Sequence, residues 1–194
     1  MKHLSNLIFP LLLLLGFSCT AQKQLAGTNS VITGADRMEV YLPFLQDKAV
    51  GVFANHTSMV KNSHLVDTLL KRGIRVVKIF GPEHGFRGKA DAGETVTDGI
   101  DAKTGIPVIS LYGNHKKPTK ADLKDLDVLV FDIQDVGVRY YTYISSLQYF
   151  LEAALENHKP LMILDRPNPN GFYVDGPVLD TNFRSFIGMQ PVPV

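Results

Sequence analysis

Five short apolar segments, separated by polar loops and helical patterns, constrain the fold of this chain most strongly. They cover residues 49–54, 75–80, 107–111, 127–133 and 160–165. Between them, apolar residues recur at helical spacing over residues 65–70 and again over residues 143–155. Continuously apolar strands that alternate with helices are typical of a parallel sheet covered on both faces. The sequence therefore predicts an α/β fold with a mostly parallel sheet and helices on both faces.

The N-terminus has the pattern of an export signal. Lys2 and His3 precede the apolar run Leu7–Leu15, and small residues follow. The run is about half the roughly 20 residues that a membrane-spanning helix needs. We expect a signal peptide over residues 1–18, and the polar, small residues that follow predict a tether over residues 19–36.

The single cysteine stands directly after the predicted signal peptide. Cys19 occupies the position of the acylated cysteine in bacterial lipoproteins, although Gly16 stands where an aliphatic residue is usual. The alternative is cleavage after Ala21, which would release a soluble secreted protein. We expect a lipid anchor at Cys19 that attaches the protein to a membrane of the bacterial cell envelope, with the chain in the periplasm.

Composition and motifs exclude several classes of site. One cysteine rules out a disulfide framework and a multi-thiolate metal site. The formal net charge is +1, without the basic stripe that nucleic-acid binding requires. No glycine-rich phosphate loop follows any predicted strand, so we expect no nucleotide and no other cofactor. His56, His84 and Asp132 are an alternative metal-ligand set, but they lack tight ligand spacing, and no metal site is predicted.

Polar clusters follow four of the five predicted strands. Ligands bind beyond the carboxyl ends of the strands in open parallel sheets, so the fold is expected to bring these clusters to one rim. The clusters cover residues 55–58, 81–88, 132–141 and 165–170. Their content of Asp, Glu, His and Arg favours a functional site over ordinary polar loops.

Three carboxyl groups are catalytic candidates. Glu83 follows an apolar strand, and partial burial of a carboxyl group suits a general acid. Glu94 lies on the same loop, and Asp132 ends the most apolar strand. Either is a candidate second carboxylate. The alternatives are a surface or capping role for Glu83, a solvated loop charge for Glu94 and a backbone cap for Asp132.

The remaining candidates are predicted to bind substrate. Arginines on the rim suit a carboxylate-bearing ligand because the guanidinium binds carboxylates through two parallel hydrogen bonds. Tyr140, Tyr141, Tyr143 and Phe86 are candidates for stacking on a sugar ring, with core packing as the alternative for Tyr143. The predicted substrate-binding residues are Asn55, His56, His84, Arg87, Gln134, Asp135, Arg139, Tyr141, Asp165, Arg166 and Asn168.

Several of these motifs together resemble a known family, the NamZ-type exo-β-N-acetylmuramidases, long catalogued as a domain of unknown function. The resemblance runs from about residue 37 to the last residue. The stretches that carry it are Gly81–Gly88, Ala92–Glu94, Ser110–Gly113, Val130–Ile144, Leu164–Pro169 and Asp175–Pro177.

The resemblance implies a bacterial glycoside hydrolase, exported or lipid-anchored. Members release N-acetylmuramic acid from the non-reducing end of peptidoglycan fragments, so the implied partners are muramic-acid saccharides. They have a Rossmann-like N-terminal domain and a smaller C-terminal domain, with the active cleft between them. Glu83 matches the proposed catalytic glutamate. The family continues beyond Val194, so we expect residues 37–194 to be the Rossmann-like catalytic domain of a longer protein.

Two questions stay open from the sequence. Glycosidases usually place a second carboxylate opposite the acid, but a substrate-assisted route through the N-acetyl group is an alternative. A non-catalytic lipoprotein of the cell envelope that binds peptidoglycan fragments is the alternative function.

Overall fold

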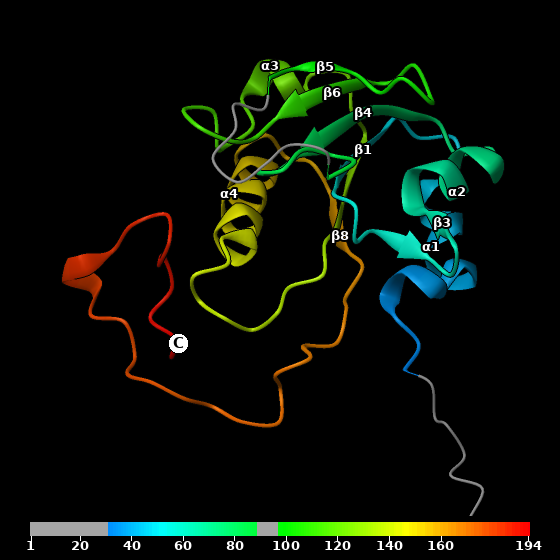
Figure 1. Ribbon diagram of the computed structural model, residues 1–194. Helices are drawn as coiled ribbons and strands as arrows, with labels where there is room; N and C mark the ends of the chain where they lie inside the picture. The colour runs from blue at the N-terminus through cyan, green and yellow to red at the C-terminus, as the bar shows by residue number, and fades with distance from the viewer. Residues whose placement is uncertain (1–30, 89–96) are drawn as a thin grey trace, which may run out of the picture. The chain divides into compact units, whose positions relative to one another are not determined.

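A six-stranded sheet forms the centre of the computed structural model, which describes residues 31–88 and 97–194 (Figure 1). The strands lie in the order β5-β6-β4-β1-β7-β8, and all neighbours are parallel except β5 and β6. Their bounds are β1 Val50–Ala54, β4 Val76–Gly81, β5 Gly99–Ile100, β6 Pro107–Ser110, β7 Val128–Asp132 and β8 Leu161–Ile163. All five predicted strands are confirmed.

The order of the strands fixes where a ligand is expected. Numbered along the chain, the five parallel strands lie in the order 3-2-1-4-5, which is the Rossmann-like arrangement. From β1 the chain first builds β4 and β6 on one side and then β7 and β8 on the other. The topological switch point therefore lies between the carboxyl ends of β1 and β7, at Ala54 and Asp132.

Helices cover both faces of the sheet, as predicted (Figure 1). Helices α1 (Met38–Leu45) and α2 (Leu65–Lys71) pack on one face, and α3 (Lys120–Leu123) and α4 (Tyr143–Glu156) pack on the other. Successive strand residues point to opposite faces. In β1, Val52 and Ala54 accordingly join the core under α1 and α2, whereas Phe53 joins the core under α4.

Aromatic rings fill the core under α4. The Phe53 and Phe131 rings are stacked with centroids 4.9 Å apart, and Phe150 from α4 lies 5.2 Å from Phe53 and 5.4 Å from Phe80. Tilted and offset ring pairs add to the free energy gained from burying their area. This cluster fixes the middle of α4, at Phe150, against the last residues of β1, β4 and β7.

Several short elements had no sequence prediction. They are α1, which contains Pro43, the hairpin β2 (Met59–Val60) and β3 (Ser63–His64), β5, α3, and the 3₁₀ helices η1 (Gly34–Asp36) and η2 (Thr181–Phe183). The folded unit includes η1, which the sequence assigned to the tether, because Ala35 is fully buried and its carbonyl accepts a hydrogen bond from the Tyr41 hydroxyl at 2.9 Å.

Three predicted features lie outside the described residues. These are the signal peptide, the part of the tether over residues 19–30 with Cys19, and the candidate Glu94. Within the described ranges, 31–88 and 97–194, no helix has the length and apolarity needed to cross a bilayer.

Candidate active site

Loops from distant parts of the sequence meet beyond the carboxyl ends of the strands. The backbone amide of Gln134 donates to Thr57 Oγ1 at 3.0 Å, and this hydrogen bond joins the loops after β7 and β1. Gln134 Nε2 donates to the Pro167 carbonyl at 2.9 Å, which joins the loop after β8. Gly88 (φ 66°) lies so close to His56 that a Cβ there would sit 2.7 Å from the ring. The four polar clusters therefore share one rim.

The loop that carries Glu83 is a tight turn anchored in the core. His84 and Gly85 both adopt the left-handed conformation, with φ of 68° and 74°. This conformation is costly for a non-glycine residue such as His84 and is typical of functional loops. Phe86 anchors the turn, since it is only 4% exposed and its ring lies edge-on to His64 at 4.7 Å. The suggestion that Phe86 stacks on a sugar is therefore wrong.

Glu83 lies half-buried in a cavity of about 300 Å³. The other residues that line this cavity are His84, Tyr140, Tyr141, Thr142 and Tyr143. The cavity lies over the end of β1, because Glu83 follows β4 and the tyrosines follow β7, the two neighbours of β1. Its volume is at the lower end of the range for small-molecule sites. Among the described residues that line it, Glu83 is the single carboxylic acid.

The tyrosines of this cavity differ in exposure. Tyr140 and Tyr141 are 58% and 53% exposed, so their rings are accessible to a ligand. Tyr143 is half-buried at the start of α4 and also packs against the aromatic core. Burial raises the pKa of the Tyr143 phenol, and the side chain of Asn55 partly offsets this shift. Tyr143 thus packs in the core, as the alternative expected, and also lines the cavity, and its stacking on a sugar ring stays a prediction.

Asp132 forms a buried ion pair with Arg166. Arg166 Nε donates to Oδ1 at 2.5 Å and Nη2 donates to Oδ2 at 2.9 Å, and Nη2 also donates to the Met59 carbonyl. Asp132 is fully buried, and burial raises its pKa while Arg166 acts in the opposite direction. In this structure the pair joins the end of β7, the loop after β8 and strand β2, and it exposes no atom of Asp132. A catalytic role for Asp132 stays a prediction.

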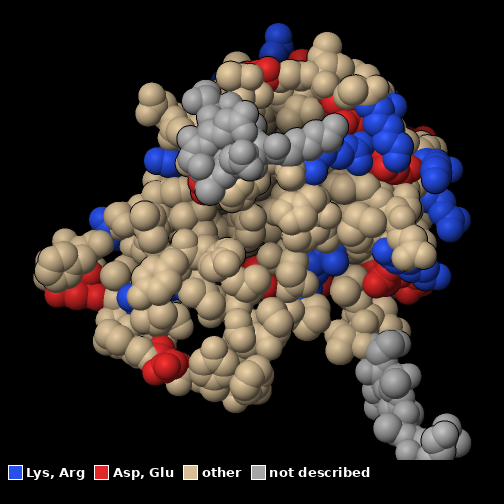
Figure 2. Space-filling view, in the orientation of Figure 1, with Lys and Arg blue, Asp and Glu red and all other residues tan. Residues whose placement is uncertain are grey.

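Arg87 connects the Glu83 loop to helix α2, through Asp67, and to the segment after β5, through Asp101. Its guanidinium donates to Asp101 at 2.8 and 3.0 Å and to Asp67 at 3.2 and 3.4 Å, and it lies 4.4 Å from the centre of the Phe86 ring. Lys103 reaches Asp67 at 2.6 Å. Figure 2 shows Lys and Arg interspersed with Asp and Glu on the side that carries α2. Arg87 therefore holds the loop in place, and its predicted contact with substrate is untested.

This network predicts an acid-sensitive contribution to stability. The hydrogen bonds from Arg87 lower the pKa of Asp101 to about 2, from 3.8. A depressed carboxyl pKa stabilises the folded state above the unfolded value, and this contribution is lost as pH falls toward 2. It amounts to about 2 kcal/mol. In urea unfolding, Asp101→Asn should be less stable than wild type by about this amount at pH 6. The difference should shrink steadily below pH 5, and a gap that stays constant would contradict the assignment.

Asn55 and its neighbours form the buried floor of the rim. Asn55 Oδ1 accepts hydrogen bonds from the amide and hydroxyl of Thr57 at 2.8 and 2.6 Å. The Ser58 hydroxyl donates to the Asp132 carbonyl. Asn55 is 1% exposed, and its Nδ2 is buried without a hydrogen bond of standard geometry among the described residues. Asn55 therefore lies buried beneath the rim and fixes the position of Thr57 in the loop after β1.

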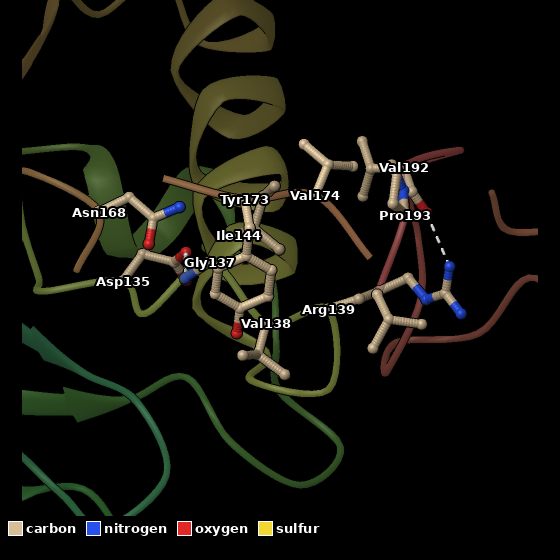
Figure 3. Close-up of a pocket in the computed structure, with 11 residues that line it drawn as sticks. Asp135, Gly137, Val138, Arg139, Ile144, Asn168, Tyr173, Val174, Val192 and Pro193 are labelled. Atoms are coloured by element: carbon tan, nitrogen blue, oxygen red, sulfur yellow. Dashed lines mark hydrogen bonds between the residues drawn. The ribbon is translucent and has the colours of Figure 1, made fainter. Parts of the chain in front are cut away.

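A second cavity of about 300 Å³ lies beside the loops after β7 and β8 (Figure 3). Arg139 borders it and donates to the carbonyls of Val192 at 2.7 Å and Pro177 at 3.1 Å. Asp135 accepts from the Gly137 amide at 2.8 Å, and Asn168 packs against Gly137. The structure thus groups Asp135, Arg139 and Asn168 here, apart from Glu83.

The other candidates lie as follows. His56 and Asp165 are exposed, and the Asp165 carbonyl accepts from the Gly34 amide at 2.7 Å. His56, His84 and Asp132 do not form a metal-ligand group, since no three His, Cys, Asp or Glu side chains in residues 31–88 and 97–194 are suitably clustered.

Tyr112 is a site residue that the sequence analysis did not select. It follows β6, and its hydroxyl donates to Glu83 Oε1 at 2.9 Å. The available signal was its position, because Tyr112 directly follows a predicted strand. The pairing of Gly81 with Ser110, which places Glu83 and Tyr112 each two residues beyond a paired position, is visible only in the structure.

Fold and site together define a Rossmann-like α/β domain that presents a carboxyl group in a tyrosine-lined cavity beside its topological switch point. Residues 50–194 match the family described as "Exo-beta-N-acetylmuramidase NamZ, N-terminal", and the chain belongs to this family. It is 46% identical over 180 residues to the peptidoglycan β-N-acetylmuramidase NamZ of Bacillus subtilis (strain 168). The alignment covers 90% of this chain and 43% of that relative, so the chain spans less than half of its length.

Two solved structures from Bacteroides fragilis NCTC 9343, both described as DUF1343 family proteins, share the fold. One is 47% identical with a TM-score of 0.74, covering 84% of this chain and 42% of its own. The other is 41% identical with a TM-score of 0.75, covering 83% and 41%.

Proposed function

We propose that the protein is an exo-acting glycoside hydrolase that releases N-acetylmuramic acid from the non-reducing end of peptidoglycan fragments. Family membership supports this, since the B. subtilis relative is named a peptidoglycan β-N-acetylmuramidase. The observation that carries the chemical role is the half-buried Glu83 carboxyl inside the tyrosine-lined cavity.

Glu83 acts as the general acid in this proposal. It donates its proton to the glycosidic oxygen as the bond to the departing sugar breaks. The exposed rings of Tyr140 and Tyr141 offer apolar faces against which the pyranose ring of the muramic acid packs. These groups come from loops after two different strands, so a correctly folded sheet is needed to assemble them.

A second group assists cleavage of the glycosidic bond from the opposite side of the sugar. This group is either the carboxylate of Glu94 or the substrate's own N-acetyl group. Glu83 is the one acid among the described residues lining the cavity, and Asp132 is enclosed in its pair with Arg166. Glu94 belongs to the same loop as Glu83 in sequence. A Glu94→Gln variant separates the two routes, because only the first requires its carboxylate.

We also propose that the protein is exported and anchored by lipid at Cys19. The basic and apolar pattern over residues 1–18 supports export. Mass spectrometry of the mature N-terminus tests this. A diacylated Cys19 is expected, and an unmodified Gln22 start contradicts the anchor.

The decisive test is the reaction itself. The whole protein, as its gene encodes it, should release free N-acetylmuramic acid from a MurNAc-GlcNAc disaccharide, detected by mass spectrometry. Saturable binding of the disaccharide without product at any protein concentration would instead support a non-catalytic protein that captures peptidoglycan fragments.

A further inference from the structure

We propose that Tyr112 is a positioning residue for the general acid, and that its hydroxyl determines which oxygen of Glu83 carries the catalytic proton. This inference deepens the proposed function and rests on it. It starts from one contact, the hydrogen bond of 2.9 Å from Tyr112 Oη to Glu83 Oε1.

The sheet holds the two side chains in fixed register. Strands β4 and β6 are parallel neighbours, with Gly81 opposite Ser110, and the Leu111 amide extends the ladder by donating to the Gly81 carbonyl at 2.8 Å. Glu83 and Tyr112 each come two residues after a paired position. The ends of two adjacent strands thus place the phenol beside the carboxyl group, which gives more precise positioning than a contact between two mobile loops.

The chemistry of the hydrogen bond assigns the proton. A protonated carboxyl group has one O–H donor and one acceptor oxygen. Because Tyr112 donates to Oε1, Oε1 is the acceptor and the proton resides on Oε2. When Oε2 transfers its proton to the leaving oxygen, Glu83 becomes an anion and the same hydrogen bond becomes charge-assisted and stronger. Tyr112 therefore stabilises the charge that develops on Glu83 during the reaction.

The state of the phenol is consistent with this role. The hydrogen bond to Glu83 raises the pKa of Tyr112 above its ordinary value of 10.0. The phenol accordingly remains protonated and a hydrogen-bond donor at neutral pH. Tyr112 is half-buried, and Leu111 beside it is buried in the core, which fixes the start of the loop.

Tyr112→Phe tests the inference by removing only the hydroxyl. A hydrogen bond to a charged group is lost, so kcat should fall by about 10- to 100-fold while KM changes by less than about 2-fold. Tyr149→Phe is the matched control. It deletes the same hydroxyl on α4, where the ring stacks on Phe186, and should leave kcat and KM unchanged.

A second measurement keeps this inference separate from the proposed function. In protein labelled with ¹³C at the tyrosine ζ carbons, the Tyr112 signal is assigned by its loss in Tyr112→Phe. Its titration midpoint should fall in Glu83→Gln and stay constant in Glu39→Gln, because the carboxylate of Glu83 raises the pKa of Tyr112. If the midpoint moves but wild type releases no N-acetylmuramic acid, the coupling stands and the proposed function fails. If wild type is active while the kcat of Tyr112→Phe and the Tyr112 midpoint in Glu83→Gln both match wild type, the positioning role is overturned.

Discussion

Glu83→Gln should lower kcat for release of N-acetylmuramic acid by about 10²–10⁴-fold, the usual contribution of a general acid. Glutamine has the same shape and its amide oxygen still accepts the hydrogen bond from Tyr112, but it has no proton to donate to the leaving oxygen. The measurement is kcat on the disaccharide for the whole protein. KM should change little, because the loss concerns an interaction made in the transition state.

Glu39→Gln is the matched control for this experiment. Glu39 lies exposed on α1, away from the Glu83 cavity, and undergoes the same chemical change. It should retain wild-type kcat. A Glu83→Gln enzyme with wild-type turnover would show that another group donates the proton. If circular dichroism shows that both variants are folded, loss of structure cannot account for a difference between them.

Arg166→Met should reduce the free energy of unfolding by about 3–5 kcal/mol at neutral pH. The substitution leaves the Asp132 carboxylate fully buried without its partner, and an uncompensated buried charge is strongly unfavourable. Burial already raises the pKa of Asp132, and Arg166 is the group that opposes this. A carboxyl pKa above its unfolded value destabilises the folded state as pH rises. The deficit of the variant should therefore be smallest near pH 4 and grow toward neutrality.

Adding Asp132→Asn to Arg166→Met identifies the source of the loss. The double variant carries no buried charge, so it should recover part of the lost stability and lose the pH dependence. Urea unfolding of the four proteins at pH 4 and pH 7 gives the full double-mutant cycle. If the two single effects simply add, the proposed coupling between Asp132 and Arg166 is absent.

The central strands of the sheet were predictable because they are buried on both faces. Every position of β7 is buried, and a strand in that environment is apolar along its length, as Val128–Phe131 are before Asp132 ends the strand. The elements that were missed are short or partly exposed. The hairpin of β2 and β3 has two residues in each strand, and β5 is exposed, so neither leaves a periodic pattern.

The candidate site was predictable only as a location. Each cluster directly follows a strand, and the carboxyl ends of parallel strands share one edge. The roles of the individual side chains depend on pairings across long separations in sequence. In the sequence, Arg87 and Arg139 both resemble ligand-binding arginines. In the structure, the guanidinium of Arg87 binds Asp67 and Asp101, and that of Arg139 donates to two backbone carbonyls.

The sequence by itself determined the five strands, the helices on both faces, the family and the edge at which Glu83 lies, because burial and strand-end position are local properties of the residue pattern. Only the tertiary structure decided that Asp132 is enclosed by Arg166, that Phe86 is an anchor, and that Tyr112 holds Glu83. Those outcomes depend on which strands are neighbours and in what register, and this is set by the packing of the whole domain.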